Sequence, residues 1–490
     1  METVSSSSDQ PLAAPPEASA PAPSSSRLST VVTVVSAVIL VVFLLFIGWL
    51  MFAEPRVAGY KDADRALALV VGRTLDVHDA LQGVPRWESR LYEWTALEGG
   101  NDLRQALGWY EELARYSVDP LVDLHLAILE AEAGQLDRVD RATAEWRQRE
   151  DPLPAFADLI SIAYLDPGEA SEAPDTAVLA MLGGEWFRDR VFSALARRSG
   201  DEGAVAAVAR EATARGRRLL FRVRALTIVQ LALLAGGLVA IVAVVRRRRD
   251  LAVGTAPLPP PWTARAGIAT LIRGGAAAAL VTAALLFVYQ SSSDAVGDVL
   301  TVPATYLPFL PLLALARWHL IKPSHRGVAE VFGLRPCPGR LGLLIVVAAA
   351  LTAAGMIGEW ALSQVGDREG LATHWTEWFD HDLVWGTLPL TLITVIGAVV
   401  FAPLMEELVF RGLIFGTLRR RLPTGVAAVV SATLFAVPHG YGVLGFVAVF
   451  WSGLLWAYAY EETGSLLPGM AAHALNNAVA SVTVLALLRG

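Results

Sequence analysis

The chain of 490 residues contains a single cysteine, Cys337, and this scarcity limits the chemistry that it can perform. One cysteine excludes an intrachain disulfide framework and a cysteine cluster for zinc. Two signatures of hydrolytic enzymes are also missing. The sequence has no Gly-x-Ser-x-Gly nucleophile motif and no His-Glu-x-x-His pair of a soluble zinc protease. Any hydrolytic site in this chain must therefore be built from other groups.

Excess positive charge is also absent. The formal net charge is −7. The stretch from Glu54 to Arg224 holds 30 acidic and 22 basic residues, a net of −8, so the remainder is close to neutral. An acidic soluble part joined to a near-neutral apolar part argues against nucleic acid as a partner.

Apolar side chains are abundant, at 54% of the chain, and they are gathered into long runs. A run of about 20 apolar residues is long enough to cross a bilayer as a helix. No strand alternation is sustained in the rest of the chain, whose period is helical. We therefore predict an all-α, polytopic membrane protein with about nine spans, at residues 31–53, 225–245, 266–289, 299–316, 341–363, 384–417, 424–438, 442–460 and 464–488.

Changes in composition divide the chain into four parts. Residues 1–28 are rich in Ser, Pro and Ala and predict a disordered tail. Residues 29–53 predict a retained transmembrane anchor, because the apolar run exceeds a usual signal-peptide core and lacks a strongly basic leader. Residues 54–222 predict a soluble helical domain, and residues 225–490 a multi-span membrane domain.

Part of the soluble stretch has the spacing of a helical repeat. A helical pattern from Pro120 to Glu130 is followed by a turn at Gly134 and a second amphipathic stretch, and Pro154 closes the unit after 34 positions. This is the period of a tetratricopeptide-like hairpin. We predict a tetratricopeptide-like domain that binds or positions a polypeptide, with a generic helical bundle as the alternative.

The charges between the apolar runs alternate in sign. The loops at 246–249, 317–340 and 419–421 are basic, whereas those at 294–298 and 367–382 are acidic. By the positive-inside rule, the basic loops are cytoplasmic. We therefore expect a protein of the cell membrane with a cytoplasmic N-terminus and an extracytoplasmic soluble domain. The arginines between positions 215 and 224 are the exception to this pattern.

Ionisable residues interrupt one apolar run, the stretch Phe401-Ala-Pro-Leu-Met-Glu-Glu-Leu-Val-Phe-Arg-Gly412. Charged groups inside a bilayer are costly, so they indicate a functional site. Glu407 and Arg411 are four residues apart on one helix face and can neutralise each other. Glu406 lies about 100° round the helix and remains free to face another group.

Three more polar residues lie at membrane depth further along the chain. His439 ends one apolar segment, and His473 and Asn477 share a face of the last one. A carboxylate and a neutral imidazole can hold a water molecule and remove its proton. A second imidazole and an amide can donate to the oxyanion that follows the attack. The same groups could instead bind zinc through Glu406, His439 and His473.

The order and spacing of these residues resemble a known protein family. They resemble the three motifs of the CAAX-prenyl-protease and bacteriocin-processing (CPBP, or Abi) family of intramembrane endopeptidases. The resemblance covers residues 225–490. The motifs are, in order, Glu406-Glu-x-x-x-Arg411, Phe435-x-x-x-His439 and His473-x-x-x-Asn477.

The resemblance implies an intramembrane endopeptidase, an EC 3.4 hydrolase of the kind that processes CAAX-box proteins. It implies that Glu406 and His439 activate water and that His473 and Asn477 stabilise the oxyanion. The remaining pair, Glu407 and Arg411, would support the site. The family is often called a metalloendopeptidase family, yet the resemblance implies a glutamate-dependent mechanism that uses no metal. We expect no cofactor here, with zinc as the alternative.

Two other functions remain open for these residues. Buried Glu, His and Arg also line ion paths in transporters. The chain could also be an inactive membrane scaffold whose soluble domain binds partner proteins. For the protease, we expect a membrane-associated peptide or protein as the substrate, and the lipid bilayer as the surroundings.

Overall fold

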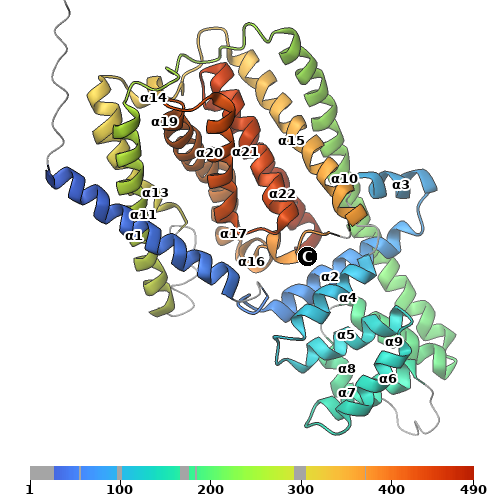
Figure 1. Cartoon of the computed structure of the whole chain (residues 1–490). Coiled ribbons are helices and arrows are strands. Elements are labelled where there is room, and N and C mark those ends of the chain that lie inside the picture. The colour runs from blue at the N-terminus through green and yellow to red at the C-terminus, as the bar shows by residue number, and fades with distance from the viewer. Residues whose placement is uncertain are drawn as a thin grey trace, which may run out of the picture.

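The computed structural model describes residues 27–53, 57–95, 102–165, 176–182, 185–291, 305–369 and 371–489. Nearly all of these residues are helical, and the described ranges contain no β-strand (Figure 1). The all-α prediction is therefore confirmed. The predicted tail up to residue 26 and the acidic loop at 294–298 lie outside the described residues.

In the ranges that the structure describes, seven helical segments are long and apolar enough to cross a membrane, which confirms a polytopic membrane protein. The two predicted spans at 299–316 and 424–438 are not among them. The first is described only from residue 305 and contains the short helix α13 (Phe309–Ala316). The second is α20 (Thr424–Ala436), whose 13 residues rise about 20 Å, less than the thickness of a hydrocarbon core. The seven segments lie at Arg27–Leu50, Glu202–Arg246, Ala264–Val288, Leu341–Glu369, Leu388–Leu418, Val443–Thr463 and Leu467–Leu488.

Within the described residues, eight helices lie between the first and second long segments, and we call them the helical unit. Seven of them surround a buried apolar core that includes Leu67, Tyr110, Phe156 and Phe187, whereas the helix Arg86–Thr95 packs through Tyr92 into a separate cluster beside Leu219. The helices are α2 (Ala63–Leu81), α3 (Arg86–Thr95), α4 (Asp102–Leu113), α5 (Pro120–Glu132), α6 (Leu136–Trp146), α7 (Leu153–Tyr164), α8 (Thr176–Met181) and α9 (Glu185–Ser199).

The predicted helix–turn–helix lies in this unit. Helices α5 and α6 are joined through Gly134, whose φ of +75° suits a residue without a side chain. Asp119 caps α5 by accepting a hydrogen bond from the Leu121 N–H at 2.9 Å. The tetratricopeptide-like assignment and the four-part division of the chain stay predictions.

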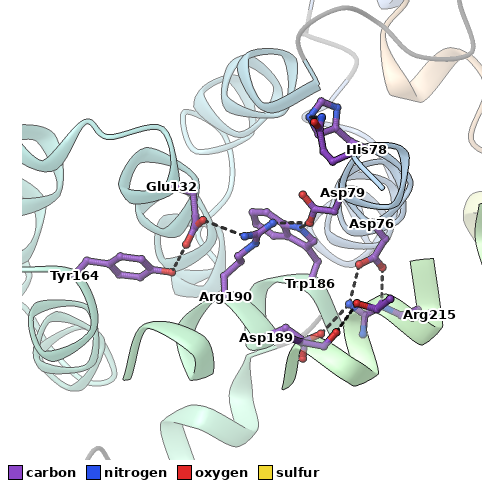
Figure 2. Close-up of polar contacts among 12 residues, drawn as sticks. Asp76, His78, Asp79, Glu132, Tyr164, Trp186, Asp189, Arg190 and Arg215 are labelled. Atoms are coloured by element: carbon purple, nitrogen blue, oxygen red, sulfur yellow. Dashed lines mark hydrogen bonds and ion pairs between the residues drawn. The ribbon is translucent and has the colours of Figure 1, made fainter. Parts of the chain in front are cut away.

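One helix belongs to both the helical unit and the membrane part. Helix α10 (Glu202–Arg246) begins beside the helical unit and continues along α15 (Leu341–Glu369), as Figure 1 shows. Arg215 on α10 is buried against two carboxylates of the unit, 2.7 Å from Asp76 and 2.8 Å from Asp189 (Figure 2). Burial raises the pKa of Asp76 despite this guanidinium. The ion pairs attach α10 firmly to α2 and α9.

The core of the helical unit extends into the membrane part. Trp375 and Phe379 are buried in the same apolar cluster as the unit's own core residues, and so are Val484 and Leu488. The last two lie at the C-terminal end of α22 (Leu467–Leu488), which lies close to α2 in Figure 1. The helical unit is therefore packed onto the membrane helices by apolar burial as well as by charge.

The long segment Leu388–Leu418 is not a regular α-helix. It passes from α17 (Leu388–Ile396) into the π-helix η4 (Gly397–Phe401), then α18 (Ala402–Glu406), the π-helix η5 (Glu407–Phe415) and α19 (Gly416–Leu418). Pro403 lies at the start of α18, where it lacks a backbone N–H to donate. π-Helical turns within α-helices are frequently found at functional sites. Both carboxylates of the first motif lie at the junction between α18 and η5.

Candidate active site

The predicted ion pair of the first motif is present and fully enclosed. Arg411 donates from Nη1 to Glu407 Oε1 at 2.9 Å, and the two side chains are 0% and 1% exposed. The i,i+4 prediction is therefore confirmed, although the two residues lie on a π-helix. Because the pair is buried, each charge depends on the other for its stability.

Aromatic rings cover the rest of the guanidinium. Its carbon lies 4.2 Å from the ring centre of Phe435 on α20 and 5.0 Å from that of Trp456 on α21 (Val443–Thr463). Such cation–π contacts stabilise a desolvated guanidinium. Within the described part of the chain, Nε and Nη2 have no hydrogen-bond partner. Arg411 is therefore held by one carboxylate and two aromatic faces.

His473 on α22 contacts both glutamates. Its Nδ1 lies 3.2 Å from Glu407 Oε1, and its Nε2 lies 3.7 Å from Glu406 Oε2. The imidazole also stacks on Trp456, with ring centres 4.2 Å apart and planes inclined by 18°. The ring is thus fixed in a plane that presents one nitrogen to each carboxylate. The sequence did not predict this arrangement, because His473 and the two glutamates lie on different helices.

The two glutamates differ in access. The Glu406 side chain is 20% exposed, and its contact with His473 is longer than a hydrogen bond. Glu407 is closed in by Arg411 and His473. His473 lies within reach of both carboxylates, where it can share a proton with them. Glu406 is therefore the carboxylate that can meet another molecule.

His439 lies in a short 3-10 turn, Val437–His439, after α20. Its Nδ1 lies 2.9 Å from the Phe435 carbonyl oxygen. If Nδ1 carries the proton for this bond, Nε2 is free to accept one. The Phe435 ring is edge-on to both imidazoles, 5.0 Å from His439 and 5.9 Å from His473 between ring centres. The second and third motifs thus meet at one aromatic side chain.

Asn477 is held by the first π-helix. Its Nδ2 donates to the Ala398 carbonyl oxygen in η4 at 2.8 Å. The amide nitrogen carries two hydrogens, so one of them is committed to η4 and one remains for another acceptor. The irregular helix that carries the glutamates is therefore fastened to α22 at a second point, one helical turn after His473.

The alternative zinc ligands are not arranged as a metal site. Within the described ranges, no group of three His, Cys, Asp or Glu side chains is arranged to hold a metal ion. His439 is directed to a backbone carbonyl, whereas Glu406 and His473 contact each other. The expectation about cofactors stays a prediction.

Sequence comparison bears on this region alone. Residues 388–479 match the family model described as type II CAAX prenyl endopeptidase Rce1-like. This segment is Rce1-like. The match covers less than a fifth of the chain, includes all three motifs, and confirms the resemblance drawn from them. It implies intramembrane protease activity, without assigning roles to residues. No curated protein and no solved structure matches the chain.

Proposed function

We propose that this protein is an intramembrane endopeptidase that hydrolyses a peptide bond with water activated by Glu406. The observation that carries the proposal is the position of His473 between Glu406 and Glu407, inside the Rce1-like segment. Because Glu407 is neutralised by Arg411, Glu406 is left as the general base. No Ser or Cys nucleophile is needed for this chemistry.

The reaction then has two proton transfers. Glu406 removes a proton from water as the water oxygen attacks the carbonyl carbon of the substrate, and His439 Nε2 helps to hold that water. The remaining N–H of Asn477 and the imidazole of His473 donate to the oxyanion that forms. Glu406 returns its proton to the leaving nitrogen as the C–N bond breaks. Glu407 and Arg411 hold His473 in place throughout.

The substrate that suits this site is a peptide segment of a membrane-associated protein. Glu406, His473 and Asn477 all lie on segments of membrane-spanning length, so the scissile bond must reach them there. The description of the matching family model names type II CAAX prenyl endopeptidases. We propose the same class of chemistry here, with CAAX-box processing as one instance of it.

A second role is proposed for the helical unit. A groove of about 630 Å³ lies over α5, α6 and the start of α7. Its walls carry both acidic and basic side chains, among them Asp123, Glu130, Arg141 and Arg149. Side chains of both charges beside apolar ones such as Trp146 suit an extended polypeptide, which can offer groups of both signs. We propose that this groove binds a substrate or partner protein.

Orientation in the cell membrane follows from the basic loops, and we propose a cytoplasmic N-terminus and an extracytoplasmic helical unit. The test is labelling of Val118→Cys, a 99% exposed position, in a Cys337→Ala background. A membrane-impermeant thiol reagent should label this cysteine in intact cells. Labelling only after permeabilisation would contradict the orientation.

The proposed activity is tested by comparing membrane-protein termini in cells that carry wild type, Glu406→Gln or Glu462→Gln. The control residue Glu462 is an exposed glutamate near the end of α21. New termini should appear with wild type and with the control, and disappear with Glu406→Gln. If transport were the function instead, the set of termini would be the same in all three strains.

A further inference from the structure

A short segment between α15 and α17 connects the helical unit to the candidate site. We call residues 374–379 the 374–379 loop, and it contains the 3-10 turn Trp375–Glu377. His374 caps this turn, because its Nδ1 accepts a hydrogen bond from the Thr376 N–H at 3.3 Å. The loop therefore has a defined shape of its own.

One side of the loop is buried in the helical unit. The fully buried indole of Trp375 packs edge-on against Tyr60, with ring centres 4.8 Å apart; Tyr60 lies just before α2 and packs against the core of the unit. The Tyr60 hydroxyl donates to the Phe379 carbonyl oxygen at 3.0 Å. His374 Nε2 lies 3.4 Å from a carboxylate oxygen of Glu112 on α4. Apolar burial, a hydrogen bond and a charged group thus fix the loop to the unit.

The other side of the loop reaches the start of α21. Glu377 Oε1 accepts a hydrogen bond from the Gly442 N–H at 2.9 Å. Gly442 directly precedes α21, so this carboxylate satisfies an N–H that the helix itself leaves without a partner. Gly445 leaves the space that this contact needs, since a Cβ there would lie 2.4 Å from Glu377 Oε2.

The hydrogen-bonded residue is close in sequence to His439. The chain turns at Gly440, whose φ is +66°, and the rings of His439 and Tyr441 lie 5.5 Å apart. His439, Gly440, Tyr441 and Gly442 therefore form one compact turn, the 439–442 turn. A contact that fixes its last residue limits the movement of its first, because only two residues lie between them.

We propose that Glu377 is a positioning residue for His439, and that the helical unit sets this position through the 374–379 loop. The catalytic consequence rests on the proposed function, in which His439 holds the attacking water. The structural part does not depend on it. The helical unit holds the Glu377 carboxylate in place, and this carboxylate fixes the 439–442 turn. A molecule that binds to the helical unit can therefore change the position of His439 without contacting the site.

The structural part is tested with a nitroxide label on Val443→Cys in a Cys337→Ala background. Val443 is the first residue of α21 and is 68% exposed. Glu377→Ala should make the label more mobile, and Glu377→Gln should restore most of the order because its amide oxygen can still accept. Asp367→Ala, an exposed carboxylate at the end of α15, should change nothing. Equal mobility in Glu377→Ala and wild type would overturn the proposal.

The link to the helical unit is tested with Tyr60→Phe, which removes the donor to Phe379 and keeps the ring. The label at position 443 should become more mobile than in wild type, though less than in Glu377→Ala. A label unaffected by Tyr60→Phe would overturn the part of the proposal that assigns the helical unit a role.

The catalytic part is tested by steady-state kinetics on the same full-length variants. A misplaced catalytic group slows the chemical step, so Glu377→Ala should lower kcat by about 10-fold and leave KM unchanged. Glu377→Gln should recover most of kcat. Unchanged kcat in Glu377→Ala, when wild type is active and Glu406→Gln is not, would overturn the positioning role alone. Absence of proteolysis in wild type would instead contradict the proposed function, and the label would still decide the structural part.

Discussion

At the scale of single residues, the site separates two adjacent glutamates by what surrounds them. Glu407 faces Arg411 at hydrogen-bond distance, whereas Glu406 keeps a partly exposed side chain. The sequence predicted this division, because residues four apart share a face of a helix. It did not predict that His473 would contact both carboxylates. That contact depends on how α22 packs against η5, which no spacing within one segment encodes.

Glu407→Gln should destabilise the protein. Loss of one member of a buried ion pair strands the other charge, which costs about 3–5 kcal/mol. Lower thermal stability in detergent and lower abundance in the membrane are the measurements. Glu462→Gln is the matched control, since that glutamate is exposed. A Glu407→Gln protein as stable as wild type, yet inactive, would show that Glu407 acts in the chemistry and not in support of Arg411.

At the scale of helices, close packing depends on small residues. Gly237 on α10 faces Ala353 on α15, where an added Cβ would lie 2.3 Å from the Ala353 Cβ. Small residues allow membrane helices to approach in this way. The lengths of the helices could also be predicted in part from the sequence. The sequence predicted most of the spans, but α20 is too short to be one, and the π-helices η4 and η5 carry no pattern that periodicity detects.

Gly237→Ala should therefore weaken the contact between α10 and α15. Overpacking a tight contact costs about 1–3 kcal/mol, so the thermal midpoint in detergent should fall. Ala353→Gly in the same chain should restore part of the loss by returning the space. Gly236→Ala is the neighbouring control, because nothing lies within 4 Å of its added Cβ. Equal stability of the Gly236 and Gly237 variants would contradict the packing described here.

At the scale of the whole molecule, the helical unit and the membrane helices share one apolar cluster. Trp375 and Leu488 belong to it together with core residues of α2 and α5. The sequence marked the unit as a separate soluble domain because its composition changes at Glu54. It could not reveal the shared core, since Trp375 lies in a loop more than 200 residues away from the unit's first half. In the sequence, Arg215 is only one of several arginines that depart from the alternation of loop charges, and nothing there indicates its ion pairs with Asp76 and Asp189.

Arg215→Met should loosen the helical unit from α10. The substitution leaves Asp76 and Asp189 buried without their cation, at a cost of about 3–5 kcal/mol. Limited proteolysis should cut the helical unit faster than in wild type. Arg217→Met, which changes an exposed arginine two residues further along α10, should not alter the rate. Equal cleavage rates for the two variants would contradict the anchoring role.

The central claim is that Glu406 activates the water that cleaves a peptide bond. Its most direct test is hydrolysis of a lipid-anchored fluorogenic peptide by purified full-length protein in lipid nanodiscs. Wild type and Glu462→Gln should cleave the peptide at similar rates, whereas Glu406→Gln should be slower by about 100-fold or more, because an amide cannot act as the base. Turnover by Glu406→Gln close to that of wild type would contradict the account.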